Sequence, residues 1–284
     1  MRSPIISADS FSAVRSPEAK TSDAALAAAL RLWADRLAPT AAFVVLVVIW
    51  EAACRLLAVP VFLLPAPSEI AVAAVQNAPL LIDAAANTLL MAVLAFLLAA
   101  GLAFAVALLI STHPLAERAV QPLAVSLQVT PIMAIAPLAV IWAGLDHPAR
   151  AVVGLAAIVA FFPIFSGALT GLKSADPDLE RLFDLYGASA WDRLFRLRLP
   201  SAVPFLLEGL KVAAGLALIG AVVAEFVARS GLSRGLAWRL MEASNRLETA
   251  KTFAALFVLV LMGVGLNALM RGAERAVLRW WRGR

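Results

Sequence analysis

The stretch AAANTLLMAVLAFLLAAGLAFAVALLISTHPLA, residues 84–116, contains no Asp, Glu, Lys or Arg. Asp83 precedes it and Glu117 follows it. An α-helix rises 1.5 Å per residue, so about 20 apolar residues cross the roughly 30 Å of hydrocarbon in a bilayer. This stretch is long enough to cross a membrane as one helix, and it therefore decides the fold class.

The composition of the whole chain agrees with that interpretation. Of its 284 residues, 62% are hydrophobic and 15% are charged, and the mean hydropathy is +0.89. A soluble domain is about half apolar and one quarter charged. One soluble core of this size could not bury so much apolar surface. We therefore predict an all-α membrane protein.

Five other apolar intervals predict further spans, which gives about six in total. The predicted spans are 39–58, 85–111, 120–143, 151–172, 203–228 and 252–270. The fifth contains Glu208 and Lys211, which share a helix face three residues apart and can pair. A transmembrane domain is thus predicted at 39–271, between an N-terminal tail at 1–38 and a basic C-terminal tail at 272–284.

Positive charge predicts the orientation of the spans. Most Lys and Arg residues outside the spans lie on the side of the two termini, so we expect both termini in the cytoplasm. The net charge of +5 follows from these flanking residues, and we predict no nucleic-acid partner. Residues 24–37 are expected to form either an amphipathic helix on the inner membrane surface or a helical lead-in to the first span.

Several kinds of chemistry are missing from the sequence. It contains no Gly-Lys dipeptide, so a phosphate-binding Walker A loop is excluded. His113 and His147 have no partner at the spacing of metal ligands. Cys54, the one cysteine, lies in an apolar run and is predicted to be a small buried hydrophobic residue. We predict no catalytic residue, no metal site and no cofactor in this chain.

The connection at 173–202 has a different pattern, KSADPDLERLFDLYGASAWDRLFRLRLPSA. Asp176 followed by Pro177 predicts a helix start. Two short amphipathic helices are predicted, separated by a break at Gly187 and ended by Pro200. Their apolar positions are Leu179, Leu182, Phe183 and Tyr186, then Trp191, Leu194, Phe195 and Leu197. Such a pair suits docking into the groove of another protein or lying on the inner membrane surface.

This connection resembles the loop E-A-A-x-x-x-G, nine residues, I-x-L-P of binding-protein-dependent ABC importer permeases. Gly187 matches the glycine, and Leu197, Leu199 and Pro200 match the last motif at the same spacing. The chain departs from the family where Arg181 replaces the glutamate, and Glu180 lies one place earlier. Residues 122–145, 161–172 and 208–226 resemble the nitrate, sulfonate, taurine and pyrimidine-precursor branch.

The resemblance implies a type I importer permease in the bacterial inner membrane, built as a homodimer. It implies that a cytoplasmic ATP-binding subunit binds the ATP and that a periplasmic or extracellular solute-binding protein delivers the solute. It also implies ATPase-coupling residues at Leu182, Phe183, Tyr186, Gly187, Ala188, Leu197, Leu199 and Pro200. The expected order of substrates is small organic anions or sulfonates, then pyrimidine or vitamin precursors, then nitrate-like ions.

Polar and proline residues of the spans give candidates for the translocation path. Pro122, Pro131 and Pro137 loosen the span at 120–143, which also contains Gln128 and Thr130. The alternative for these polar residues is packing between helices.

Two further features have more than one interpretation. Glu225, at the outer end of the fifth span, either contacts the binding protein or gates the path, or is a solvated interfacial acid. Gly167 and Gly171 predict close helix packing, within or between subunits. Glu51 and Arg55 are predicted to pair.

Two other functions compete with the importer. A self-contained secondary carrier or facilitator would transport without ATP, but the spans contain few of the mid-membrane charges that ion coupling usually requires. A membrane-embedded enzyme or assembly scaffold is the third class, and the absence of catalytic clusters opposes the enzyme.

Overall fold

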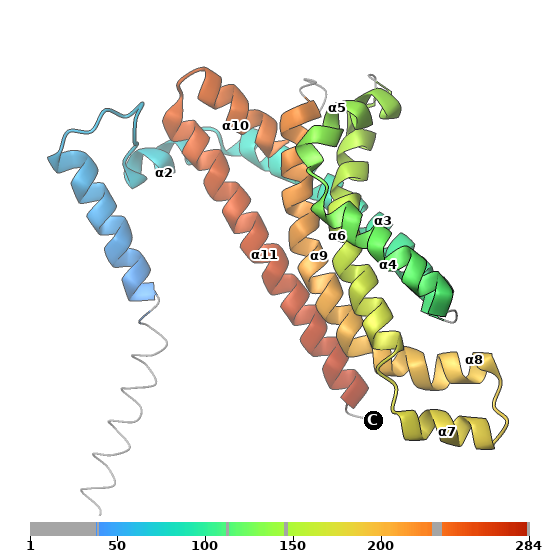
Figure 1. Cartoon of the computed structure of the whole chain (residues 1–284). Helices are drawn as coiled ribbons and strands as arrows, with labels where there is room; N and C mark the ends of the chain where they lie inside the picture. Colours follow the sequence, from blue (N-terminus) through green and yellow to red (C-terminus); the bar gives the residue numbers. More distant parts are fainter. Residues whose placement is uncertain (1–37, 39, 112–113, 145–146, 229–234, 283–284) are drawn as a thin grey trace, which may run out of the picture. The chain divides into compact units, whose positions relative to one another are not determined.

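The computed structural model describes residues 38, 40–111, 114–144, 147–228 and 235–282 (Figure 1). The predicted amphipathic segment at 24–37 lies outside these ranges. The chain divides into two compact units, residues 1–59 and 60–284, which are described separately. In the first unit, residues 40–56 are helical, as the span at 39–58 predicts.

The side chains of the first helix follow the sequence pattern. Arg55 Nε donates to Glu51 Oε1 at 2.6 Å, so the predicted pairing of these residues is confirmed. Cys54 is buried, which confirms its prediction as a small buried hydrophobic residue.

Among the described residues of the second unit, four helices are long and apolar enough to cross a membrane. They are α3 (Ala78–Ser111), α6 (Pro148–Leu172), α9 (Leu199–Ala228) and α11 (Thr249–Arg282). They confirm the predicted spans at these places, and α11 extends through most of the predicted C-terminal tail. One bent helix pair adds a fifth candidate span. The total of six spans stays a prediction.

Small residues bring α6 and α9 into close contact. A Cβ atom on Gly167 would lie 2.7 Å from the Phe205 carbonyl oxygen, and one on Gly209 would lie 2.5 Å from the Pro163 carbonyl oxygen. A Cβ atom does not fit at these distances from a backbone oxygen, so both positions require glycine. The close packing predicted for Gly167 and Gly171 is confirmed, and it occurs within the subunit. In membranes, where burial from water drives little association, such close packing holds helices together.

The buried face of α3 follows the same principle. Its members recur three or four residues apart and are nearly all alanine, which lets neighbouring backbones approach. They are Ala84, Thr88, Ala92, Ala95, Ala99, Ala103 and Ala107, with the larger Leu81 and Ile110 at the two ends of the face.

The predicted span at 120–143 is not one continuous helix. It consists of α4 (Pro114–Val129) and α5 (Ile132–Ala143), whose axes differ by 98°. The predicted span is broken at Pro131, one of the prolines expected to loosen it, because Pro131 has no backbone N–H and pushes Thr130 out of the helical conformation. Pro131 itself is extended, with φ −64° and ψ 110°. Pro122 lies inside α4 without interrupting it.

At one end of the bundle, α7 (Pro177–Leu185) is followed by α8 (Ala190–Arg193) and a π-helical turn, η1 (Leu194–Arg198) (Figure 1). The two predicted short helices are therefore confirmed. Pro200 was expected to end the second one, and this was wrong. The chain remains helical over Ala190–Val227, because local π-helical adjustment satisfies the backbone groups that proline frees.

Two short helices lie at the opposite end of the bundle (Figure 1). They are α2 (Pro67–Gln76) and α10 (Leu236–Asn245), and the span pattern did not predict either. Leu236 of α10 is fully buried in a cluster with Leu81, Ala84, Ala254 and Ala255. The connection between α9 and α11 is thus packed onto the bundle through α10.

Candidate functional site

The α7–α8 hairpin, which comprises residues 176–198, is built by local backbone chemistry. Asp176 Oδ1 accepts a hydrogen bond from the Asp178 N–H at 2.8 Å, which confirms the predicted start of α7. Gly187 has φ +65°, a left-handed conformation that favours glycine, and the Ala188 N–H donates to the Phe183 carbonyl at 2.9 Å. Ser189 Oγ then accepts from the Asp192 N–H at the start of α8. Asp176 and Ser189 thus cap the starts of the two helices, and Gly187 allows the turn between them.

Two ion pairs hold the helices of this hairpin together. Arg198 Nε donates to Glu180 Oε1 at 2.7 Å, which joins α7 to η1. Arg193 pairs with Asp184, which joins α8 to α7. Arg181, which stands where the family motif has its glutamate, instead pairs with Asp178 on the open face of α7. Glu180, together with Asp184, therefore supplies the acids that fix the hairpin in this chain.

The predicted coupling residues divide into two groups. Tyr186 is 82% exposed and Leu182 is 44% exposed, beside the exposed Gly187. Phe183 and Ala188 are half-buried. The second group faces the bundle: Leu197 is buried, and Leu199 packs against the main core, next to the half-buried Pro200.

Two aromatic residues that were not among the predicted coupling residues add to the exposed face. Trp191 and Phe195 stack with their ring centroids 5.7 Å apart, and both are exposed. Their i, i+4 spacing in the sequence could have identified them. The hairpin thus exposes apolar side chains on α7, on α8 and on η1.

The predicted path residues lie in two separate places. Gln128 and Pro131 are exposed at the α4–α5 bend, and Thr130 is half-buried. Thr130 Oγ1 donates to the Ser126 carbonyl at 2.6 Å, which satisfies a backbone acceptor at the break. These residues could face a passage or another helix.

Glu225 is buried at the end of α9, with 1% of its surface exposed. Its Oε1 accepts a hydrogen bond from Thr88 Oγ1 at 2.8 Å, and its Oε2 accepts one from the Ala237 N–H at 3.1 Å. The Leu236 N–H donates to Thr88 Oγ1 at 2.9 Å. Glu225 and Thr88 therefore cap the N terminus of α10, and the interpretation of Glu225 as a solvated acid is wrong.

This close approach depends on Gly235. A Cβ atom there would lie 2.1 Å from Glu225 Oε1. A role of Glu225 in gating or in contact with a binding protein stays a prediction.

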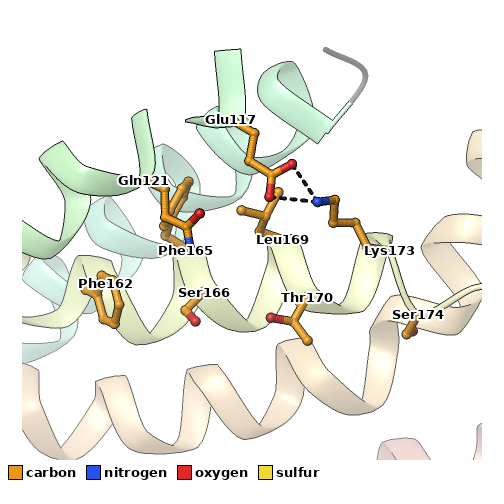
Figure 2. Close-up of a pocket in the computed structure, with 9 residues that line it drawn as sticks. All are labelled: Glu117, Gln121, Phe162, Phe165, Ser166, Leu169, Thr170, Lys173 and Ser174. Carbon is orange, nitrogen blue, oxygen red and sulfur yellow. Dashed lines mark hydrogen bonds and ion pairs between the residues drawn. The ribbon is translucent and has the colours of Figure 1, made fainter. Parts of the chain in front are cut away.

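A cavity of about 420 Å³ lies between α4 and α6, at the end of the bundle that holds the hairpin (Figure 2). Glu117 and Gln121 line it from α4. From α6 and the residues after it, the lining consists of Phe162, Phe165, Ser166, Leu169, Thr170, Lys173 and Ser174. The sequence predictions missed this cavity. Its signal was the hydroxyl residues that recur at helical spacing beside phenylalanine on one face of α6.

An ion pair bridges the two walls of the cavity. Lys173 Nζ donates to both carboxylate oxygens of Glu117, at 2.7 and 2.5 Å (Figure 2). Lys173 directly follows Leu172, the last residue of α6, and begins the connection to α7. Within the described ranges, no three His, Cys, Asp or Glu side chains gather closely enough to hold a metal ion.

Comparison with known protein families gives one match that covers most of the chain. Residues 98–282 match the family described as binding-protein-dependent transport system inner membrane component. The matched region contains the hairpin, the cavity and Glu225.

Several curated relatives are ABC transporter permeases. The formylaminopyrimidine transport permease ThiX of Halalkalibacterium halodurans is 33% identical over 86% of this chain and 96% of its own length. The putative aliphatic sulfonates permease SsuC of Bacillus subtilis is 30% identical over 66% of this chain and 67% of its own. The riboflavin transport system permease RibX of Chloroflexus aurantiacus is 32% identical over 58% of this chain and 59% of its own length.

One solved structure has a similar fold. It is the crystal structure of an amino acid ABC transporter with histidines, with a TM-score of 0.56 and 17% sequence identity. The match covers 71% of this chain and 96% of that one.

Proposed function

Because the chain belongs to the family of binding-protein-dependent transport system inner membrane components, we propose that its α7–α8 hairpin docks on the ATP-binding subunit of an importer. The chain is the transmembrane permease component of an ABC importer for a small solute, and its family works with ATP-binding and solute-binding components. This membership favours the importer over the self-contained carrier. We assign ATP hydrolysis to the ATP-binding subunit.

The observation that supports this docking site is the exposed apolar face of the hairpin. Leu182, Tyr186, Trp191 and Phe195 project from helices whose own fold is fixed by caps and ion pairs. Aromatic side chains are enriched at the central contacts of protein interfaces. Leu197, Leu199 and Pro200 have a second role, since they join this surface to α9.

Movement of the hairpin has a direct route into the membrane. The helical segment Ala190–Val227 runs from the hairpin through α9 without a break in the chain. The glycine contacts between α9 and α6 then pass a displacement to α6 and the cavity. ATP binding and the loaded solute-binding protein would each favour one of two discrete helix arrangements, which gives alternating access.

The proposal also covers the assembly, its orientation in the membrane, the passage and the solute. Two copies of the chain form a homodimer in the bacterial inner membrane, with both termini and the hairpin in the cytoplasm. The positive charge beside the spans supports this orientation. Gln128, Thr130 and Pro131 line part of the passage, and Glu225 positions α10 for the solute-binding protein. The relatives are named for formylaminopyrimidine, sulfonate and riboflavin transport, which supports a small organic solute.

Replacement of Gly187 by valine tests the docking site. A β-branched residue at φ +65° costs about 1–2 kcal/mol of backbone strain, although a Cβ atom there meets no neighbour. We expect the Gly187→Val variant to insert normally but to lose solute uptake and the bound ATPase. Gly187→Asn is the matched control, because asparagine tolerates this conformation. Unchanged uptake by Gly187→Val would count against the proposal.

A further inference from the structure

We propose that the α4–α6 cavity is a solute site for a planar, uncharged heteroaromatic ring, and that the Glu117–Lys173 pair excludes small anions from it. This inference rests on the proposed function, since a solute site has meaning only in a permease. It goes further by naming the chemical class of the solute and the residues that select it.

The lining combines ring surfaces with neutral hydrogen-bonding groups. Phe162 is half-buried and Phe165 is buried, and both line the cavity from α6 together with Ser166 and Thr170 (Figure 2). Phe165 stacks on Phe161 at 5.6 Å, so Phe162 offers the freer ring. Aromatic rings bind planar heterocycles by offset stacking or edge-to-face contact.

The polar groups of the cavity are available to a ligand. In the part of the chain that the structure describes, the side chains of Gln121, Ser166 and Thr170 make no hydrogen bond to protein groups. Each offers both a donor and an acceptor. A heterocycle with ring nitrogens and an exocyclic amino group needs this mixture along its edge, whereas a saturated sulfonate cannot use the rings.

The charges of the cavity oppose an anionic solute. Glu117 and Lys173 are the two charged residues among the nine that line it, and Lys173 Nζ contacts both oxygens of Glu117. The pair is neutral overall, so an anion that entered would lose its hydration without gaining an unpaired cation. The neutral ion pair therefore favours the heterocycle over the sulfonates and nitrate-like ions that the family resemblance also allowed.

The size and place of the cavity suit a solute in transit. A volume of about 420 Å³ lies within the range of ordinary small-molecule sites. Lys173 and Ser174 belong to the cavity wall, and the hairpin begins at Asp176, directly after Ala175. A displacement of the hairpin therefore changes the cavity directly, which would release a bound solute.

The test uses the full chain with its co-purifying ATPase in lipid nanodiscs, without the solute-binding protein. The native Cys54 is replaced by alanine, and a Ser166→Cys variant is labelled with a maleimide. The probes are cytosine, a neutral planar pyrimidine, and methanesulfonate, a small anion. Cytosine at ten times its Kd should slow labelling by about tenfold, and methanesulfonate should not slow it. A Ser244→Cys variant, exposed at the end of α10, is the control whose labelling neither probe should change.

A second substitution tests the charge argument itself. Glu117→Gln leaves Lys173 without its partner, and methanesulfonate should then slow labelling of the Ser166→Cys variant. Protection by methanesulfonate while Glu117 is present, equal to that by cytosine, would overturn the selection of neutral solutes. Labelling that neither probe slows would overturn the solute site.

Equilibrium dialysis with radiolabelled cytosine gives a readout that needs no labelling. Phe162→Ala should weaken cytosine binding by about fivefold through the lost ring contact. Equal binding by this variant and the wild type would also overturn the site. Failure of the proposed function would be seen separately, as the absence of an ATP-binding subunit from the same preparation.

Discussion

The two ends of α9 are fixed by opposite kinds of chemistry. At its first end, ion pairs between half-exposed side chains, Glu180 with Arg198 and Asp184 with Arg193, hold the hairpin that leads into it. At its last end, the buried Glu225 accepts hydrogen bonds from Thr88 and from the backbone of α10. One end is held by solvated charges and the other by a buried network.

This difference separates a part that can move from a part that stays in place. Exposed ion pairs contribute about 0–1 kcal/mol each, so they break and re-form at little cost. A buried polar group that loses its partners costs about 1–3 kcal/mol. The hairpin end is therefore suited to follow the proposed ATPase, whereas the α10 end is suited to hold a fixed surface.

The largest expected effect comes from the middle of α9, where both ends depend on its contact with α6. Gly209→Val places a side chain 2.5 Å from the Pro163 carbonyl oxygen, and the two backbones must separate. Overpacking of this kind costs about 1–3 kcal/mol or more. We expect a lower thermal midpoint in detergent and loss of the monodisperse protein.

The matched control for that substitution is on the same helix. A Cβ atom on Gly215 meets nothing within 4 Å, so Gly215→Ala should leave the thermal midpoint unchanged or slightly raised. If both variants behave alike in a thermal unfolding series, the close α6–α9 contact does not hold the bundle together.

The next effect concerns the α10 end. Glu225→Ala leaves the Thr88 hydroxyl and the N–H groups of Ala237 and Trp238 without their acceptor. The expected cost is about 2 kcal/mol. Hydrogen exchange over residues 236–245 should accelerate markedly, while exchange in α7 stays the same. Thr88→Ser, which retains the hydroxyl, is the control. Faster exchange in α7 as well would contradict the independence of the two ends.

The smallest effect is expected at the hairpin end. Glu180→Gln removes one half-exposed ion pair, so α7 should exchange a few times faster, with a loss of about 1 kcal/mol or less. Asp178→Asn breaks a pair of almost fully exposed side chains and should change nothing measurable. The swapped pair Glu180→Arg with Arg198→Glu should restore exchange and uptake. A swap that restores neither would show that the pair does not position the hairpin.

Local features of the sequence were sufficient to predict much of this fold. Charge-free runs predicted α3, α6 and α11, because crossing a bilayer imposes a minimum apolar length. The amphipathic pattern with Asp176 and Gly187 predicted the hairpin, because caps and left-handed turns depend on a few neighbouring residues. These features need no knowledge of distant contacts.

Features that depend on distant contacts were missed. Glu225 has Thr88, 137 residues away, as its partner, and no local pattern shows that it caps α10. The Glu117–Lys173 pair and the cavity likewise join α4 to α6 across 56 residues. Pro131 was recognised as a weak point, but proline at positions 122 and 200 is tolerated within helices, so its identity alone could not predict the bend.

The hairpin is proposed above as the docking surface for an ATPase. Its most direct test is purification of the tagged full chain from its own host in mild detergent, with mass spectrometry of the proteins that accompany it. We predict a stoichiometric ATP-binding subunit with the wild type and with Leu247→Asp, which changes an exposed residue at the opposite end. The subunit should be lost when Leu182 and Tyr186 are both replaced by aspartate. Recovery of the wild-type chain alone, or full retention of the ATPase by the double variant, would contradict the account.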